Sequence, residues 1–405
     1  MNTPLIELCL LFFIASHSII SNRMLSPLMI FSSIWLTGVL IFNLSGSLYN
    51  VSLIGRGYII GFVFINIFFE VFSYKIVEKE HLLQVSSKPF QLSNKKVFYY
   101  LIYSSFFLSF IYIYPYYVES LNYESLSNYF YYSRVADKSG TPLVAHPILF
   151  QQLPPLMFCM SLLMYIFYCQ KTVFNKSKGG IIFLYSYLLL SMSLLLVSGT
   201  RSTTFIFIIS LIAIYINASR GNVLKKIIRS ILIFLCLFMV LTILMRVTNQ
   251  EKENGLVLFT LLNHIIIYIF GGIKSFDIFL QGGIGIGSEV YQSLLSISPT
   301  NIMPYVSIGE DLETNVFSVF SVYFYYFGEF IGMVLLAFIS SICYFFYTFR
   351  YVSILFFSTW ILLTSCLVLS VFHDYFSVVF PYLIRVVLLA SVFSSWQFKI
   401  HKFKF

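Results

Sequence analysis

Long apolar runs separated by short polar segments dominate the pattern of hydrophobic and polar residues along the chain. Each run is continuously apolar and close to the roughly 20 residues that a helix needs to cross a bilayer, whereas strands of a membrane β-barrel would alternate. The pattern predicts an all-α polytopic membrane protein, a single integral membrane domain over 1–405 with about eleven (ten to twelve) transmembrane helices. The runs cover roughly 4–20, 24–44, 57–74, 97–118, 147–170, 181–199, 203–218, 228–246, 316–349, 352–372 and 376–396.

Two polar segments between these runs are too long to be simple turns. One covers residues 119–146 and is rich in tyrosine, and the other covers 247–315. Loops of this length in a compact protein are usually functional or separately folded. From Thr260 to Gln281, polar or small residues recur about every 3.5 positions, which places them on one face of a helix. We therefore expect 256–281 to form amphipathic helix on the outer membrane surface, with a twelfth span as the alternative.

The composition excludes several classes of protein. Of the 405 residues, 59% are hydrophobic and 10% are charged, whereas about 25% are charged in an ordinary soluble protein. No soluble fold has enough polar surface to hide such a chain, which excludes a soluble enzyme, a nucleic-acid-binding protein and a disordered chain. The six cysteines have no paired spacing, and no dinucleotide-binding, P-loop or Cys/His metal motif occurs. We expect neither a metal nor a cofactor.

The basic residues divide unequally between the two sets of loops. One set holds 17 of the 25 lysines and arginines, and the other holds 8. Because cytoplasmic loops carry the excess of positive charge, the first set is expected to be cytoplasmic, with the N-terminus outside and the C-terminus inside. A twelfth span would move the C-terminus outside, against this bias.

The outer set of basic residues is biased toward arginine. It contains five arginines and three lysines, whereas the cytoplasmic set contains four arginines and 13 lysines. The planar guanidinium suits bidentate contact with phosphate or carboxylate, so these arginines indicate an anionic ligand. The alternative is that they only anchor the chain at the interface. Arg201 and Arg246 lie at outer ends of spans, Arg134 lies in the tyrosine-rich loop, and Arg385 lies within the last span, where a charge must face the protein interior or a wet cavity.

Other outer residues have both a functional and a purely structural interpretation. Lys274 and Asp277 are three residues apart on one predicted helix and can simply pair with each other. Tyr112 and Tyr116 lie where an aromatic belt is expected at the membrane interface, whatever the function.

Three short motifs within roughly 195–335 resemble bacterial O-antigen polymerases of the Wzy type. They are Ser198-Gly199-Thr200-Arg201-Ser202, the stretch from Tyr268 to Asp277, and Asn315-Val-Phe followed by Phe327-Gly328 and Gly332. The resemblance implies a C-type glycosyltransferase-like bundle of the bacterial inner membrane, with a large periplasmic loop over a lateral cleft. Such an enzyme transfers a growing glycan from undecaprenyl diphosphate to a repeat unit on the same carrier, without a nucleotide sugar, and works beside a chain-length regulator.

For such a reaction the residues suggest a periplasmic site. Fixed cations stabilise the charge on a diphosphate leaving group, which points to Arg201 and Arg246, with Arg134 and Arg385 in second place. The attacking hydroxyl needs a proton acceptor, for which the candidates are His264 and Glu289 on the large loop and His373 in the last outer turn. Aromatic rings suit sugar faces, and the candidates for an acceptor groove are Tyr123, Tyr129, Tyr131 and Tyr132.

Two other functions stay open. An O-antigen ligase would share the fold and the donor but use the lipid A core as acceptor, and His264 in the large loop fits that interpretation. A lipid-linked oligosaccharide flippase is an alternative of a different class. Transporters commonly contain internal repeats, and none is evident in this sequence.

Overall fold

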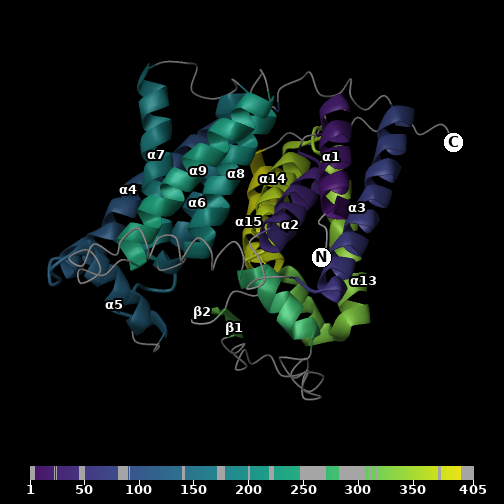
Figure 1. Ribbon diagram of the computed structural model, residues 1–405. Coiled ribbons are helices and arrows are strands. Elements are labelled where there is room, and N and C mark those ends of the chain that lie inside the picture. The colour runs from purple at the N-terminus through teal and green to yellow at the C-terminus, as the bar shows by residue number, and fades with distance from the viewer. Residues whose placement is uncertain are drawn as a thin grey trace. The chain divides into compact units, whose positions relative to one another are not determined.

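The protein is described by a computed structural model, in which helices make up almost all of the described chain (Figure 1). The described residues are 5–21, 23, 25–44, 51–80, 90, 92–138, 142–170, 178–198, 201–218, 223–246, 271–281, 306–309, 312–314, 318–372 and 375–393. The longer helices are α1 (Leu5–Ile20), α2 (Pro27–Leu44), α3 (Leu53–Glu80), α4 (Lys95–Ser120), α5 (Leu126–Lys138), α6 (Leu153–Cys169), α7 (Lys178–Val197), α8 (Arg201–Ala218), α9 (Val223–Arg246), α13 (Val319–Phe349), α14 (Ile354–Leu369) and α15 (Tyr375–Phe393). A single turn, η2 (Phe150–Gln152), precedes α6, and residues 271–280 are also helical.

Each of the eleven apolar runs contains one α-helix, so the predicted all-helical architecture is confirmed apart from one short hairpin. In that hairpin β1 (Val306–Gly309) pairs antiparallel with β2 (Leu312–Thr314). Five helical segments are long and apolar enough to cross a membrane, as an α-helical membrane protein requires: Leu53–Ile76, Lys95–Ser120, Phe150–Cys169, Lys178–Val197 and Val319–Phe349. Five other apolar helices have 10–17 residues. The count of eleven spans stays a prediction.

The chain divides into two compact units. Unit 1 comprises Met1–His81, Glu251–Thr348 and Leu363–Val378. Unit 2 comprises Leu82–Gln250, Phe349–Leu362 and Val379–Phe405. Each unit is described by itself below.

Aromatic side chains form the centre of unit 1. Phe320 of α13 makes edge-to-face contacts with Trp35 of α2 and Phe62 of α3, with ring centroids 4.9 and 5.3 Å apart. Phe276 of the 271–280 helix packs against the same ring at 5.1 Å. The indole of Trp35 also donates a hydrogen bond to the Ser370 hydroxyl over 2.9 Å. Edge-to-face packing adds to the effect of burial, so one aromatic cluster joins α2, α3, α13 and the 271–280 helix.

Two ion pairs are buried inside unit 1. Arg56 donates two hydrogen bonds to the Glu7 carboxylate, over 2.6 and 2.9 Å, and both side chains are at most 7% exposed. Arg23 donates to Glu70 over 2.8 Å, with its guanidinium 5.2 Å from the centre of the Tyr74 ring. Charges inside an apolar helical protein are expected to pair in this way. Arg56 and Arg23 therefore stabilise the fold of unit 1.

Within the described part of the predicted surface helix, residues 271–280 are largely buried in unit 1, so that part of the prediction is wrong. The Asp277 side chain is 0% exposed, and its carboxylate pairs with Lys274 over 3.1 Å. It also accepts hydrogen bonds from the Ser52 backbone N–H over 2.9 Å and from the Gln281 amide over 3.1 Å. Because Asp277 finds all of these partners within the protein, the described part of the polar stripe does not have to face water. The predicted pairing of Lys274 with Asp277 is confirmed.

The long apolar run 316–349 is broken within α13. Gly328 has φ 76° and ψ 168°, so the helix stops there and a second helical segment of about one membrane thickness follows. Gly332 lies in the first turn of that segment, where a Cβ atom would come within 3.1 Å of the Tyr323 carbonyl oxygen. The two glycines that contribute to the family resemblance therefore build a sharp turn between two helices.

We expect Gly328→Ala to destabilise the protein by roughly 1–3 kcal/mol, because the conformation at this position is open to glycine almost alone. No neighbouring atom lies within 4 Å of the position of an added Cβ, so the cost comes from the backbone. Gly61→Ala in α3 is the matched control, since it also has open space but an ordinary helical backbone. Thermal unfolding in detergent checks this, and equal midpoints for the two variants would contradict the turn at Gly328.

A different glycine tests the buried position of residues 271–280. A Cβ atom on Gly272 would lie 1.7 Å from the Val371 carbonyl oxygen, so Gly272→Ala must push the helix away from that backbone. We expect a lower unfolding midpoint and a lower yield of monodisperse protein. Gly57→Ala, which meets nothing within 4 Å, should behave like wild type. Normal stability of Gly272→Ala would show that the helix does not pack against Val371.

Candidate functional site

The helices of unit 2 bring the predicted arginines to one end of the unit. Helices α6, α7, α8 and α9 pack in sequence order, with short connections between α7 and α8 and between α8 and α9, so neighbours run in opposite directions (Figure 1). Helix α8 begins at Arg201 and α9 ends at Arg246, which places both residues at the same end. Arg134 belongs to α5, which packs against α9. We call this end of unit 2 the arginine end.

The opposite end of unit 2 carries lysines. Ring contacts between Phe98 near the start of α4 and Phe167 near the end of α6 fix the direction of α4. The backbone N–H of Ser93 donates to the Phe393 carbonyl, so the end of α15 lies here too. The helix starts at this end carry Lys95, Lys96, Lys178, Lys225 and Lys226. These lysines, together with Arg229 of α9, thus lie about one helix length from Arg201 and Arg246.

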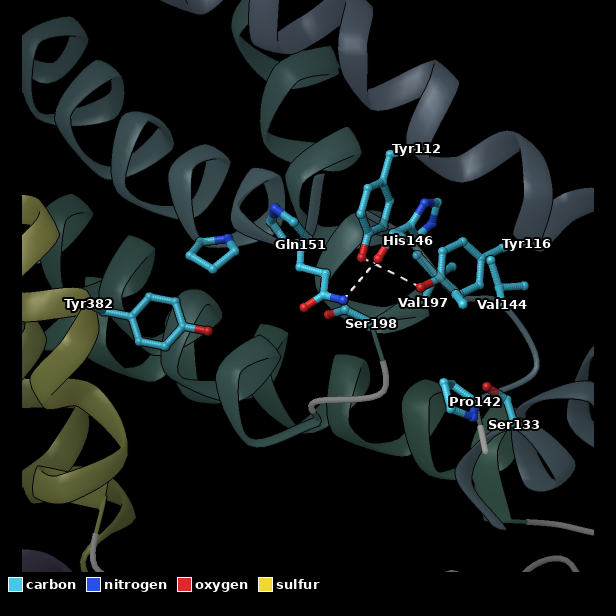
Figure 2. Close-up of a pocket in the computed structure, with 13 residues that line it drawn as sticks. Tyr112, Tyr116, Ser133, Pro142, Val144, His146, Gln151, Val197, Ser198 and Tyr382 are labelled. Carbon is cyan, nitrogen blue, oxygen red and sulfur yellow. Dashed lines mark hydrogen bonds between the residues drawn. The ribbon is translucent and has the colours of Figure 1, made fainter. Parts of the chain in front are cut away.

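A pocket with a volume of about 330 Å³ lies at the arginine end, wholly within unit 2 (Figure 2). This is near the lower limit of the roughly 300–1,000 Å³ of small-molecule sites. Five helices (α4, α5, α6, α7 and α15) and the segment before α6 contribute to its walls. The lining residues are Tyr112, Tyr116, Ser133, Pro142, Val144, Ala145, His146, Gln151, Pro154, Pro155, Val197, Ser198 and Tyr382.

Flat rings form one wall of the pocket. The His146 imidazole stacks on the Tyr112 ring with centroids 4.1 Å apart and planes inclined by 20°, and it lies 5.2 Å from the Tyr116 ring. Figure 2 shows the Tyr112 and Tyr116 hydroxyls directed toward each other, 3.5 Å apart. Below them, the Gln151 side chain donates to the His146 carbonyl over 2.9 Å. The wall therefore combines aromatic faces with several hydrogen-bonding groups.

His146 has a buried ring atom with no hydrogen-bond partner among the described residues, its Nε2. Leaving such an atom unsatisfied costs about 1–3 kcal/mol, so a ligand that supplies a hydrogen bond would recover that energy. Burial lowers the pKa of His146 below its usual 6.5, and a hydrogen bond with the Tyr112 backbone opposes the shift. The imidazole is therefore neutral at pH 7 and keeps its free base form to a lower pH than an ordinary histidine.

Arg385 is the predicted arginine whose side chain the structure describes. It donates a hydrogen bond to the Gln152 amide oxygen over 2.8 Å, and its guanidinium lies 5.9 Å from the centre of the Tyr382 ring. Gln152 is next to Gln151 and Tyr382 lines the pocket, so Arg385 lies beside the pocket rim. Arg134 follows the pocket residue Ser133, and Arg201 comes three residues after Ser198. The side chains of Arg134, Arg201 and Arg246 lie outside the described residues.

The predicted tyrosine groove is only partly available to a sugar. Tyr123 packs against Tyr129 and Tyr132, with ring centroids 5.5 and 5.7 Å away, so three of the four tyrosines gather at the start of α5. The Tyr129 side chain is only 2% exposed, which contradicts its predicted contact with sugar, because the other rings and α5 cover it. Tyr132 is 52% exposed. The side chain of Tyr131 lies outside the described residues.

The three predicted proton acceptors, His264, Glu289 and His373, also lie outside the described residues. The pocket instead contains His146, Gln151 and Tyr382, which the sequence did not single out, together with Tyr112 and Tyr116, which we expected only as an interface belt. One signal was present: His146 ends the long tyrosine-rich segment, directly before Pro147 and the next apolar run. Within the described chain, no three His, Cys, Asp or Glu residues gather as a metal site requires.

Comparisons of the chain with protein-family models, with curated proteins and with solved structures found no match.

We expect Tyr129→Ala and Tyr132→Ala to differ clearly in thermal stability. Removing a buried aromatic ring costs up to roughly 3–5 kcal/mol, so Tyr129→Ala should unfold at a clearly lower temperature. Tyr132→Ala removes a half-exposed ring and should keep nearly normal stability. Thermal unfolding of both purified variants tests the arrangement, and equal losses would show that Tyr129 is not the buried ring of the cluster.

Proposed function

We propose that the protein is a membrane glycosyltransferase that polymerises undecaprenyl-diphosphate-linked oligosaccharide repeat units into O-antigen. The observation that carries the proposal is the pocket at the arginine end of unit 2, with an aromatic wall suited to a sugar ring. Ser198, the first residue of one motif that resembles the Wzy polymerases, lines this pocket, and α8 begins at Arg201 of the same motif. The sequence motif and the pocket thus lie at the same end of unit 2.

The chemistry of the arginine end fits a lipid diphosphate donor. When the bond between the sugar and the diphosphate breaks, negative charge develops on the leaving oxygen, and preorganised cations lower the barrier. Arg201 and Arg246 are the proposed diphosphate ligands, with Arg134 and Arg385 beside the pocket as supporting cations. On our proposal no metal is needed, because the arginines supply the charge.

The surface of α4 suits substrates that remain attached to lipid. Ile111 and Tyr114 are 59% and 66% exposed, whereas Tyr112 and Tyr116 on the other side of the helix are at most 9% exposed and line the pocket. A carrier lipid along the outward face would hold its sugars close to the inward face. This arrangement fits a reaction in which the donor and the acceptor both remain attached to lipid in one bilayer.

The proposal includes a location and an orientation. The arginine end of unit 2 would face the periplasm and the lysine end the cytoplasm, because positive charge accumulates on the cytoplasmic side. The N-terminus would then be periplasmic and the C-terminus cytoplasmic, in the bacterial inner membrane. A chain-length regulator would be the protein partner.

The phenotype of a deletion strain separates the proposed function from its alternatives. Loss of a polymerase leaves a single repeat unit on lipopolysaccharide, whereas loss of a ligase leaves none. A flippase would be excluded by purified protein that elongates lipid-linked repeats without any ion gradient. The polymerase proposal would be abandoned if the deletion strain kept its normal ladder of long chains.

We expect Arg201→Ala and Arg246→Ala each to lower turnover about 10²–10³-fold, the usual loss for one oriented transition-state contact. Arg201→Lys should remain severely impaired, because the ammonium keeps the charge but loses the bidentate fork. Lys178→Ala, at the other end of unit 2, is the control and should retain activity. The measurement is elongation of lipid-linked repeats by purified, normally folded protein. Near-native rates for both arginine-to-alanine variants would make these arginines topological anchors.

A further inference from the structure

The pocket in unit 2 has the properties of a site for one sugar ring. Its walls offer the aromatic faces of Tyr112, Tyr116 and Tyr382, the amide of Gln151 and the hydroxyl of Ser198, and none of the described lining residues is a lysine or an arginine. Sugars present an apolar face, which packs on flat rings, and a rim of hydroxyls, which need donors and acceptors. Arg385, beside the rim, donates a hydrogen bond to Gln152.

His146 is the lining residue able to accept a proton at neutral pH. Its ring is held against Tyr112, with centroids 4.1 Å apart, and its backbone carbonyl is fixed by Gln151. Its Nε2 is buried and has no partner among the described residues. A general base must have a free lone pair within reach of the hydroxyl that it deprotonates. The fixed His146 ring, whose Nε2 has no partner among the described residues, provides such a lone pair.

We propose that this pocket binds the sugar acceptor and that His146 takes the proton from the attacking hydroxyl through Nε2. The assignment rests on the proposed polymerase function and adds to it the acceptor subsite and the base. It replaces the large-loop residues as the first choice for proton acceptor. Tyr112 and Tyr116 hold the imidazole ring, and Gln151 holds the backbone that carries it.

The proposed step balances as a single glycosyl transfer. The acceptor oxygen forms a bond to the anomeric carbon of the donor sugar, and its proton passes to His146. The bond between that carbon and the diphosphate oxygen breaks, and its electron pair leaves with undecaprenyl diphosphate. His146 later returns the proton to solvent or to the departing diphosphate, so the protein is unchanged after each cycle.

The surroundings of His146 favour its neutral form, as a base requires. Tyr112 and Tyr116 on α4 and Tyr382 on α15 are the titratable groups that line the pocket with it. Arg385 lies beyond Gln152 on the α15 side. Burial lowers the pKa of His146 below 6.5, so the midpoint of the acidic loss of activity should lie below pH 6.5.

The test uses full-length protein in detergent with a defined probe: the lipid-linked repeat unit extracted from a strain that lacks this gene. We expect His146→Gln to lower kcat by about 10²–10⁴, the usual contribution of a general base, with little change in KM. The acidic limb of the wild-type pH profile should disappear in this variant. His17→Gln in α1 of unit 1 is the matched control and should keep the wild-type rate and profile.

The outcomes separate the two proposals. If wild-type protein does not elongate the probe, the polymerase function itself is overturned. If wild type elongates it and His146→Gln stays within threefold of its rate with the same pH profile, the function stands and His146 is not the base. A lower rate together with a raised KM and an unchanged acidic limb would also overturn the assignment, because it describes a binding or structural residue.

A second measurement needs no substitution and therefore no folded variant. Diethyl pyrocarbonate modifies neutral imidazoles, and mass spectrometry can distinguish the six histidines of the chain. We expect modification of His146 in wild-type protein to fall several-fold when the lipid-linked repeat unit is added, while modification of His17 does not change. Equal labelling of His146 with and without this probe would contradict an acceptor site in the pocket.

Discussion

A charged group in the interior of an apolar helical protein must find its partner within the protein, and this constraint governs the structure. Where two opposite charges meet, as Arg56 and Glu7 do over 2.6 Å, they become part of the fold. The buried carboxylate of Asp277 has three partners of different kinds: the Lys274 ammonium, the Gln281 amide and the Ser52 backbone N–H. Charges without such a partner lie near helix ends, and in unit 2 Arg201 and Arg246 lie at the end opposite to Lys178 and Lys225.

Much of the fold could be predicted from the sequence, because continuous apolar runs leave few alternatives to helices. The eleven runs each contain a helix, and several boundaries agree within a few residues, as for α1 at Leu5–Ile20. The break in α13 could not be predicted, because Gly328 is one of many glycines and only its dihedral angles show its role. The position of residues 271–280 was also misjudged. A polar stripe of period 3.5 looks the same in the sequence whether water or protein satisfies it, and one of the partners of Asp277, Ser52, lies 225 residues away.

The candidate site was less predictable than the fold, because its residues are of common types and only their proximity in the folded protein distinguishes them. Tyr112 and Tyr116 have the spacing and the location of an interface belt, and nothing in the sequence distinguishes them from other tyrosines on α4. His146 lies 30 or more residues from them in the sequence and contacts them because the segment before α6 packs against α4. The arginines were easier to select as candidate site residues, since charged residues are rare in an apolar chain.

The buried pair between Arg56 and Glu7 also has a consequence for biosynthesis. The two residues are 49 positions apart, so Glu7 leaves the ribosome well before its partner. A buried charge whose partner is missing costs several kcal/mol, so α1 by itself offers Glu7 no favourable buried place. The packing of α1 can therefore be completed only after α3 has been synthesised.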